Sequence, residues 1–351
     1  MYQISKKDFL SGIQKLNNDY PIIIPTQSKE KYYLKYFPTE SWEKSHWLYP
    51  SIRTPQPLKS FYYPPQKRVA TYPGSNNTVD QPVPRVIIGA KACDVNALDI
   101  IDRVYRNGEF SDPDYVINRD QNIIISSDCL DAGEFCACTL LNNKPYLEQG
   151  FDLNISKIEN DFLLEVGSDK GELLNQKYFH AEKKAPNNLV EICNKQRQSL
   201  IEKLSKINRE FKYYRTHQQA IERHLHSDEW QDLSKTCVEC GTCTQICPTC
   251  HCFLMFDQPK DDVYERLKVW DSCFFAGYSR MAGGLTPRLS LADRFKNRFY
   301  HKFDSYVTNF GIEACTGCGR CSEGCMGNID LRKVLLELEK RVVLKEIIDL
   351  V

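Results

Sequence analysis

The chain has 351 residues and balances 46 Lys plus Arg against 46 Asp plus Glu, so its formal net charge is zero. This balance provides no global field for nucleic acid or an anionic membrane surface, and we expect neither as a partner. No apolar run reaches the roughly 18 residues of a membrane-spanning helix, so we expect no span. Residues 1–30 lack an apolar segment after a basic start, which indicates a cytoplasmic protein without an export signal.

The first part of the chain, residues 1–82, is rich in Tyr, Phe, Pro and Lys and contains one short apolar strand at 22–24. Prolines punctuate residues 50–84, and proline disfavours helix at its own position and at the residue before it. We therefore expect an extended arm there that packs against the domain.

Two short apolar runs, 85–89 and 122–126, flank a segment with apolar residues at helical spacing, 94–106. Strand, helix and strand in this order predict a right-handed crossover between two parallel, adjacent strands. Alternation at 151–158 and 162–166, on either side of a short polar turn, predicts a β-hairpin.

Glu, Lys, Gln and Leu at helical spacing dominate residues 187–230, and residues 331–351 predict an amphipathic terminal helix. The whole pattern predicts an α+β fold in three parts. An α/β sheet domain spans residues 1–185, a helical connection spans 186–232, and a mainly helical, cysteine-rich domain spans 233–351 with an insertion at 249–314.

Eight of the sixteen cysteines form two runs with the same spacing, C-x2-C-x2-C-x3-C. This spacing is typical of ferredoxin-type proteins that hold two [4Fe–4S] clusters, in which three cysteines wrap one cluster and the fourth ligates the other. The predicted ligands are Cys237, Cys240, Cys243 and Cys325 for cluster I, and Cys315, Cys318, Cys321 and Cys247 for cluster II.

Zinc and disulfides are the alternatives for these eight cysteines. A structural zinc site usually has its ligands in two separated pairs, whereas each run here carries four cysteines in a row. Disulfides need an oxidising compartment, for which the sequence gives no signal. The spacing therefore favours iron–sulfur clusters.

The predicted crossover brings a second group of cysteines to one edge of the sheet, where α/β proteins bind ligands: Cys93, Cys129, Cys136 and Cys138. Four thiolates that converge there would hold a third [4Fe–4S] cluster, with Asp94 as a substitute oxygen ligand or a close neighbour. The alternative is a set of buried thiols that tightens a turn. Cys193 stands alone in a helical stretch, as a small buried hydrophobe does.

A third group consists of Cys250, Cys252 and Cys273, with His251 between the first two. Three thiolates and an imidazole could bind zinc or contribute to a further cluster. Alternatively, they pack beside cluster I and tune its potential through hydrogen bonds.

Basic residues crowd the segment after Cys273: Arg280, Arg288, Arg294, Lys296, Arg298, His301 and Lys302. Such a run is usually a solvated helix face. Alternatively, these cations balance the negative charge of neighbouring clusters, raise their potentials and offer a docking patch.

Seven sequence blocks together resemble a known family. The chain from about residue 85 onward resembles the iron–sulfur beta subunit of cytoplasmic [NiFe] sulfhydrogenases and the related iron–sulfur subunit of anaerobic sulfite reductases. The blocks are GAKACD (89–94), EFCAC (134–138), GFDL (150–153), CPTCHC (247–252), WDSC (270–273), AGG (282–284) and DRFKNR (293–298). Met326 departs from the family, which usually has proline after the last cysteine of the second run.

The resemblance implies an electron-transfer subunit of an oxidoreductase complex in anaerobic metabolism. Its expected partners are a catalytic subunit, from a [NiFe] hydrogenase in one branch and a sirohaem sulfite reductase in the other, and a flavin-containing NAD(P)H-oxidoreductase subunit. The GFDL block and the glycine turn at 167–171 favour the hydrogenase branch. An autonomous cluster-based reductase is the alternative, although the sequence has no Gly-rich nucleotide loop, P-loop or H-E-x-x-H motif.

Overall fold

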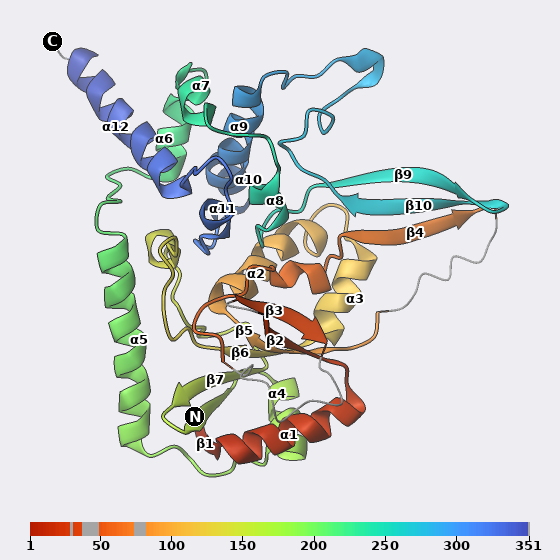
Figure 1. The fold of residues 1–351 in the computed structure, drawn as a ribbon, viewed down its shortest axis with the longest axis vertical. Helices are drawn as coiled ribbons and strands as arrows, with labels where there is room; N and C mark the ends of the chain where they lie inside the picture. The colour runs from red at the N-terminus through yellow and green to blue at the C-terminus, as the bar shows by residue number, and fades with distance from the viewer. Residues whose placement is uncertain (29–30, 37–48, 74–81, 350–351) are drawn as a thin grey trace. The chain divides into compact units, whose positions relative to one another are not determined.

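The computed structural model describes residues 1–28, 31–36, 49–73 and 82–349 (Figure 1). The chain divides into two compact units. Unit 1 comprises Met1–Tyr63, Pro82–Ile207 and Thr316–Cys318, and unit 2 comprises Pro64–Gln81, Asn208–Cys315 and Gly319–Val351. The expected helical connection, 186–232, is thus shared between the two units.

Within the described residues, unit 1 is built on a seven-stranded sheet with the strand order β1-β8-β7-β6-β5-β2-β3. Strands β2, β5, β6 and β7 run parallel to one another, and the outer pairs are antiparallel. The strands are β1 (Tyr2–Ser5), β2 (Ile22–Ser28), β3 (Lys31–Tyr36), β5 (Val86–Ala90), β6 (Ile123–Ser127), β7 (Leu153–Ile158) and β8 (Asp161–Val166).

Helices of unit 1 cover both faces of this sheet (Figure 1). Every residue of β5 and β6 is buried, which explains their continuous apolar runs. On one face, Phe9, Ile13 and Leu16 of α1 pack on alternate strand residues such as Ile88 and Ile125. The helices are α1 (Lys6–Asp19), α2 (Ala92–Tyr105), α3 (Pro113–Gln121), α4 (Asp169–Leu174) and α5 (Asn187–Ile207).

The predicted crossover and hairpin are confirmed. β5 and β6 are adjacent and parallel, as expected, and the connection between them contains α2 and also α3, a second helix that was not expected. β7 and β8 form the antiparallel hairpin. The proline-rich arm at 50–84 instead contains a 3-10 turn at Leu58–Phe61 and a strand of unit 2, β4 (Gln66–Tyr72), while 74–81 lie outside the described residues.

Unit 2 contains a three-stranded antiparallel sheet, among its described residues, with the order β4-β10-β9. β9 (Phe253–Lys260) and β10 (Val263–Trp270) form a hairpin inside the insertion, where no strand was expected. The described helices are α6 (His217–Arg223), α7 (Glu229–Ser234), α8 (Thr242–Gln245), α9 (Leu291–Tyr300), α10 (Tyr306–Phe310), α11 (Arg320–Glu323) and α12 (Leu331–Asp349).

An aromatic core fixes α9 in unit 2. Trp230 of α7 packs its ring against Phe299 at a centroid distance of 5.8 Å, and Phe295 lies 5.0 Å from Phe299. All three side chains are buried. A π-helical turn, His301–Ser305, then joins α9 to α10 and continues the same face with the buried Phe303.

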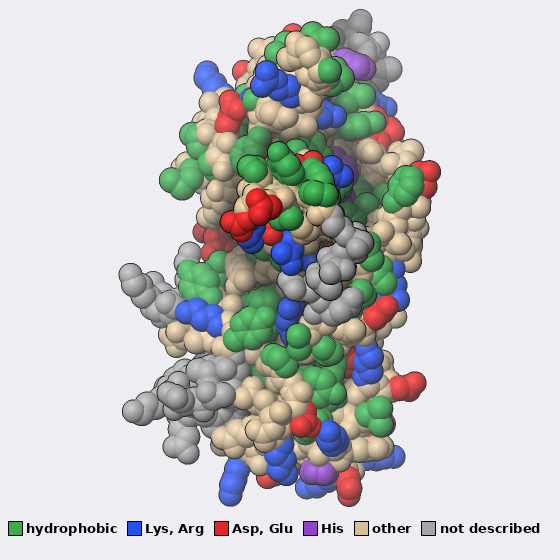
Figure 2. Space-filling model, turned by 90° about the vertical axis from the view of Figure 1, so that its right-hand side faces the viewer, with side chains coloured by type: hydrophobic (Ala, Val, Ile, Leu, Met, Phe, Trp, Pro, Cys, Tyr) green, Lys and Arg blue, Asp and Glu red, His purple; other side chains and the backbone are tan. Residues whose placement is uncertain are grey.

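The surface and the helices agree with the composition. Basic and acidic side chains are interspersed on the face drawn in Figure 2, as a net charge of zero leads one to expect. No described helix combines the length and the apolar character needed to cross a bilayer.

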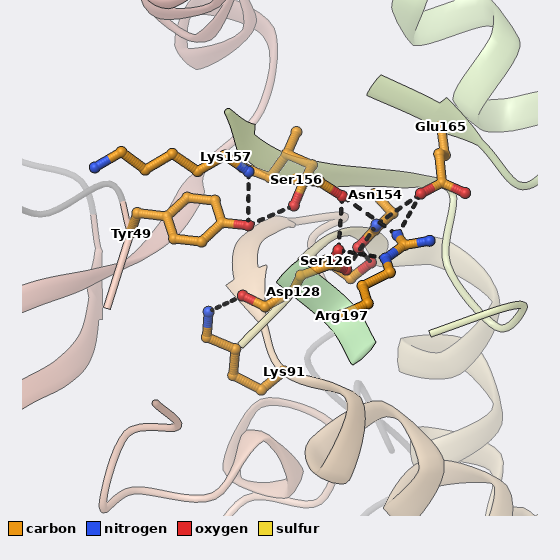
Figure 3. A network of polar contacts seen from close by, with 10 residues as sticks. Tyr49, Lys91, Ser126, Asp128, Asn154, Ser156, Lys157, Glu165 and Arg197 are labelled. Carbon is orange, nitrogen blue, oxygen red and sulfur yellow. Dashed lines mark hydrogen bonds and ion pairs between the residues drawn. The ribbon is translucent and has the colours of Figure 1, made fainter. Parts of the chain in front are cut away.

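A buried polar network ties α5 to the sheet where β6 ends (Figure 3). Asp128 directly follows β6, and its carboxylate accepts hydrogen bonds from Arg197 Nε at 2.8 Å and Ser156 Oγ at 2.7 Å. Arg197 also pairs with Glu165 of β8 at 2.5 Å. Asn154 Nδ2 donates to Asp128 Oδ1 at 3.1 Å. The network therefore holds the residues after β6, including Cys129, in a fixed place.

Arg197→Met should weaken the attachment of α5, because removing one partner of a buried ion pair leaves the other charge uncompensated. We expect a loss of about 3 kcal/mol in the free energy of local opening, measured by hydrogen exchange at amides of α5 and β6. Lys144→Met is the control, since it breaks an exposed pair with Glu148 and should cost less than about 0.5 kcal/mol. Equal effects of the two changes would contradict the role given to the network.

Candidate metal centres

The two cysteine runs of the chain adopt the same backbone conformation. In each run, the residue before the second cysteine and the residue after it have positive φ angles. Glu239 and Gly241 have φ angles of 54° and 69° in the first run, and Gly317 and Gly319 have 67° and 76° in the second. Alternating left-handed residues turn backbone N–H groups toward one concave side, which suits an anionic group. A short helix follows each loop, α8 in the first run and α11 in the second.

Close packing in unit 2 brings the end of the second run against the start of the first. A Cβ on Gly327 would lie 2.1 Å from the Thr236 carbonyl oxygen, and one on Gly324 would lie 2.8 Å from Ile246 Cδ1. No side chain fits at position 327, whereas at position 324 the end of the Ile246 side chain would have to move. The fourth cysteine of the second run, Cys325, is thereby held beside the first run.

One pocket in unit 2 is lined by all four predicted ligands of cluster I. Its walls are otherwise mostly apolar, with Phe274, Phe295, Ile329 and Leu331 among them. Thiols in an apolar pocket above left-handed loops are the donor set that a [4Fe–4S] cluster requires. These residues therefore fit such a cluster: Cys237, Cys240, Cys243 and Cys325.

The thiols are not gathered as they would be around a single ion. Among the described residues, no three His, Cys, Asp or Glu side chains lie close enough together to hold one metal ion. A cubane differs from a single ion, because each of its four irons takes one thiolate and the thiolates stay farther apart.

Arg298 of α9 supplies a buried positive charge beside the pocket. Its residue is 5% exposed, and its Nε and Nη2 atoms have no hydrogen-bond partner among the described residues. Burial opposes its charge, yet the thiols of Cys243 and Cys321 raise the pKa of Arg298 well above its ordinary value. Two buried guanidinium donors without acceptors are costly unless an anion accepts their hydrogen bonds. Sulfur atoms of a cluster in the pocket would accept hydrogen bonds from Arg298 Nε and Nη2.

Lys302, in the π-helical turn, supplies a second buried cation. Its Nζ atom donates to Thr249 Oγ1 at 2.7 Å and to the Ala314 carbonyl at 2.9 Å, and lies 3.5 Å from Cys247 Sγ. Burial opposes the charge, but nearby thiols, first Cys247 and then Cys250 and Cys315, raise the pKa of Lys302. Cys247 and Cys315, two predicted ligands of cluster II, thus share one cation.

The four predicted ligands of cluster II belong to different units. Cys247, Cys315 and Cys321 are part of unit 2, whereas Cys318 belongs to the stretch Thr316–Cys318 of unit 1. The ligand set of cluster II stays a prediction from the spacing.

The cysteines of the third group, Cys250, Cys252 and Cys273, form two separate hydrogen-bonded pairs, one of which includes Cys247. Cys250 hydrogen bonds to Cys247 and is the main cause of the lowered pKa of Cys247. Cys252 hydrogen bonds to Cys273, which lowers the pKa of Cys252 to about 6 and raises that of Cys273. His251 Nδ1 lies 3.0 Å from the Thr249 carbonyl oxygen. A metal site of Cys250, Cys252 and Cys273 stays a prediction.

The cysteines at the sheet edge lie together in unit 1. Cys138 is buried against Leu200 and Leu204 of α5, and Cys129 and Cys136 pack on the same cluster of side chains. Burial raises the pKa of Cys129 to about 11 and that of Cys138 to about 12. Thiols of this kind stay protonated and inert unless a metal binds them as thiolates.

Lys91 links Cys93 to this group. Its buried ammonium donates to Ser127 Oγ at 2.9 Å and to the Asp128 carbonyl at 2.8 Å, both neutral acceptors. Burial lowers its pKa, and the charges of Cys129, Asp128 and Cys93 oppose that shift. Asp94 instead accepts the Leu58 N–H at 3.2 Å through Oδ1.

Three cations of α9 and the following turn are buried where a charge run predicts a solvated face. Arg294, Arg298 and Lys302 are four residues apart, so they lie on one helical face, and all three are buried. Arg294 pairs with Glu239 of the first cysteine run at 2.5 Å. The solvated-face interpretation is therefore wrong for these residues. The sequence signal for their burial was the four-residue spacing, which these cations share with Phe295, Phe299 and Phe303.

Comparison with known proteins agrees with this geometry. A family model described as a 4Fe-4S dicluster domain matches residues 236–329, which include both cysteine runs. Sulfhydrogenase 2 subunit beta of Pyrococcus furiosus is 30% identical over 298 residues, which cover 83% of this chain and 85% of that protein. The chain belongs to the sulfhydrogenase beta subunit family. Like other members, it is an iron–sulfur subunit with [4Fe–4S] clusters. No solved structure matches the chain.

Arg298→Met should shift the midpoint potential of cluster I to a more negative value, because the reduced cluster carries one more negative charge than the oxidised one. Losing a charge-assisted hydrogen bond costs about 1.5 kcal/mol, and about 60 mV corresponds to a tenfold change for one electron. We therefore expect a shift of at least about 60 mV in a redox titration followed by electron paramagnetic resonance.

Arg298→Lys should give a smaller shift, since it keeps the charge and loses the planar fork of donors. Arg266→Met is the matched control, because it removes the same charge from an exposed side chain of β10. Unchanged potentials in Arg298→Met would contradict the contact between Arg298 and the cluster.

Proposed function

We propose that the chain relays electrons between the catalytic subunits of a [NiFe] hydrogenase and a flavin-containing NAD(P)H-oxidoreductase subunit, in the cytoplasm. The observation that carries the proposal is the pair of cysteine runs with one backbone conformation, of which four cysteines line a single pocket. The name of the Pyrococcus relative, a sulfhydrogenase subunit, supports the hydrogenase branch. Bound clusters would accept and release single electrons.

We also propose a third [4Fe–4S] cluster in unit 1, at the sheet edge. Three of its cysteines pack together against α5, and Cys93 lies at the first turn of α2, where the helix dipole favours a thiolate. Lys91 provides a buried positive charge between Cys93 and Cys129. The proposed ligands are Cys93, Cys129, Cys136 and Cys138, with Asp94 outside the set because it accepts a backbone hydrogen bond.

The loop of the third site contacts the second cysteine run within unit 1. The Ala137 N–H donates to the Gly317 carbonyl at 2.8 Å. Ala137 lies between Cys136 and Cys138, and Gly317 directly precedes Cys318. A Cβ on Gly317 would lie 2.4 Å from the Ala137 carbonyl oxygen, so only glycine allows this approach. This contact supports electron transfer between the third site and the second cysteine run.

The residues around the sites have separate roles in this relay. Apolar side chains such as Phe274 and Phe295 exclude water from the pocket of cluster I. Buried Arg298 and Lys302 compensate the negative charge that an added electron brings. Because no proton donor is needed for this compensation, reduction of the clusters should be accompanied by little proton uptake.

Iron content tests the third cluster. Three [4Fe–4S] clusters correspond to about twelve irons per chain, and Cys129→Ser should lower that number to about eight. Cys193→Ala is the matched control, since Cys193 is a buried thiol that packs with Ile158 and Leu163, in a cluster that contains no proposed ligand. About eight irons in the wild-type chain, purified without oxygen, would rule out the third cluster.

The partners are tested by anaerobic purification of the tagged chain from its native host. We expect nickel and flavin to co-purify, and hydrogen-dependent reduction of NAD(P)+ by the complex but not by the isolated chain. Sirohaem in place of nickel would favour the alternative, the iron–sulfur subunit of an anaerobic sulfite reductase. Hydrogen evolution or sulfite reduction by the isolated chain would contradict the relay and favour an autonomous reductase.

A further inference from the structure

The predicted ligands of cluster I differ in how far they are shielded from solvent. All sixteen cysteines lie within the described residues, and Cys240 is the single exposed one; the others are buried or intermediate. The pocket of cluster I is therefore open to the surface on the side of Cys240, while Cys237, Cys243 and Cys325 lie deeper.

Two exposed apolar side chains flank this opening. Val238 is 61% exposed and lies between Cys237 and Cys240, and Met326 is 74% exposed and directly follows Cys325. The Met326 backbone hydrogen bonds to Cys240, so the two residues are neighbours in space. Flexible Met side chains are common at surfaces that bind other proteins.

The two segments that flank the opening contain little charge, and exposed Lys235 and Glu323 lie just before them in the chain. Segments 237–243 and 325–329 contain one charged residue, Glu239. Its carboxylate pairs with buried Arg294 at 2.5 Å, and Arg294 also donates to the carbonyl groups of Phe274 and Leu289. A partner that docks here therefore meets apolar groups and a compensated ion pair.

We infer that the Val238, Cys240 and Met326 surface is the docking site of a redox protein whose own cofactor lies behind an apolar contact surface. This protein exchanges one electron at a time with cluster I, through the edge marked by Cys240. The inference rests on the proposed function and adds to it, because it assigns cluster I, and not cluster II, to the surface end of the relay. No bond is made or broken; one cofactor is oxidised as the other is reduced.

The test uses the complex purified from the native host, with Val238→Glu and Met326→Glu in the full chain. Each change places a charge in an apolar contact. One of the two electron donors, NAD(P)H or hydrogen, reduces the clusters through the partner that docks on this surface. We expect the rate of reduction by that donor to fall by at least about tenfold. Iron content and the reduction of the clusters by the small dye methyl viologen should stay close to wild type. Val238→Lys and Met326→Lys move the potential of cluster I in the opposite direction and should slow the same transfer, which separates docking from a change in potential.

Phe110→Glu is the matched control, since Phe110 is an 81% exposed apolar side chain of unit 1. It should leave both rates unchanged. The affected rate of the wild-type complex should also vary less than about threefold between low and high salt, because apolar contacts are not screened.

Several results would overturn the inference. Wild-type electron transfer in both Glu variants would place the docking site elsewhere, and a steep salt dependence would indicate a charged contact. If the isolated chain were a dimer and Met326→Glu made it a monomer, this surface would be a self-association site. Absence of cluster signals from the wild-type chain would instead refute the proposed function, and that outcome is separate from the other three.

Discussion

Burial of negative charge is the constraint on which unit 2 depends. A reduced cluster with its four thiolates is anionic, and a low-dielectric pocket raises the cost of every added electron. The positive charges of Arg298 and Lys302 offset this cost, because both side chains are buried and several cysteines lie near each of them. The same two cations would repel one another and lose their hydration in an empty pocket, so cofactor and protein stabilise each other.

The aromatic core explains how these cations are held in place. Phe295, Phe299 and Phe303 alternate with Arg294, Arg298 and Lys302 at the same spacing, so one face of α9 and its π-helical turn is apolar and the next is cationic. Packing of Trp230 against the aromatic face sets the rotation of the helix. The positions of the charges near the cysteines therefore follow from packing that lies outside the site.

Much of the site could be read from the sequence because its signals are local. The spacing of the cysteine runs, the two apolar strands of the crossover and the 151–166 hairpin depend on near neighbours in the chain. The edge strands β1 and β3 and the β9–β10 hairpin were missed, since their pairing with distant strands decides their structure. The sequence left two interpretations of the charge run with Arg298 and Lys302 open, because long-range packing decides whether such a run is enclosed.

The close approach of Gly327 to Thr236 also makes the two cysteine runs depend on each other. It holds Cys325 of one run beside the other run, so each run lends its last cysteine to its counterpart in the predicted ligand sets. Neither run alone would complete a cluster.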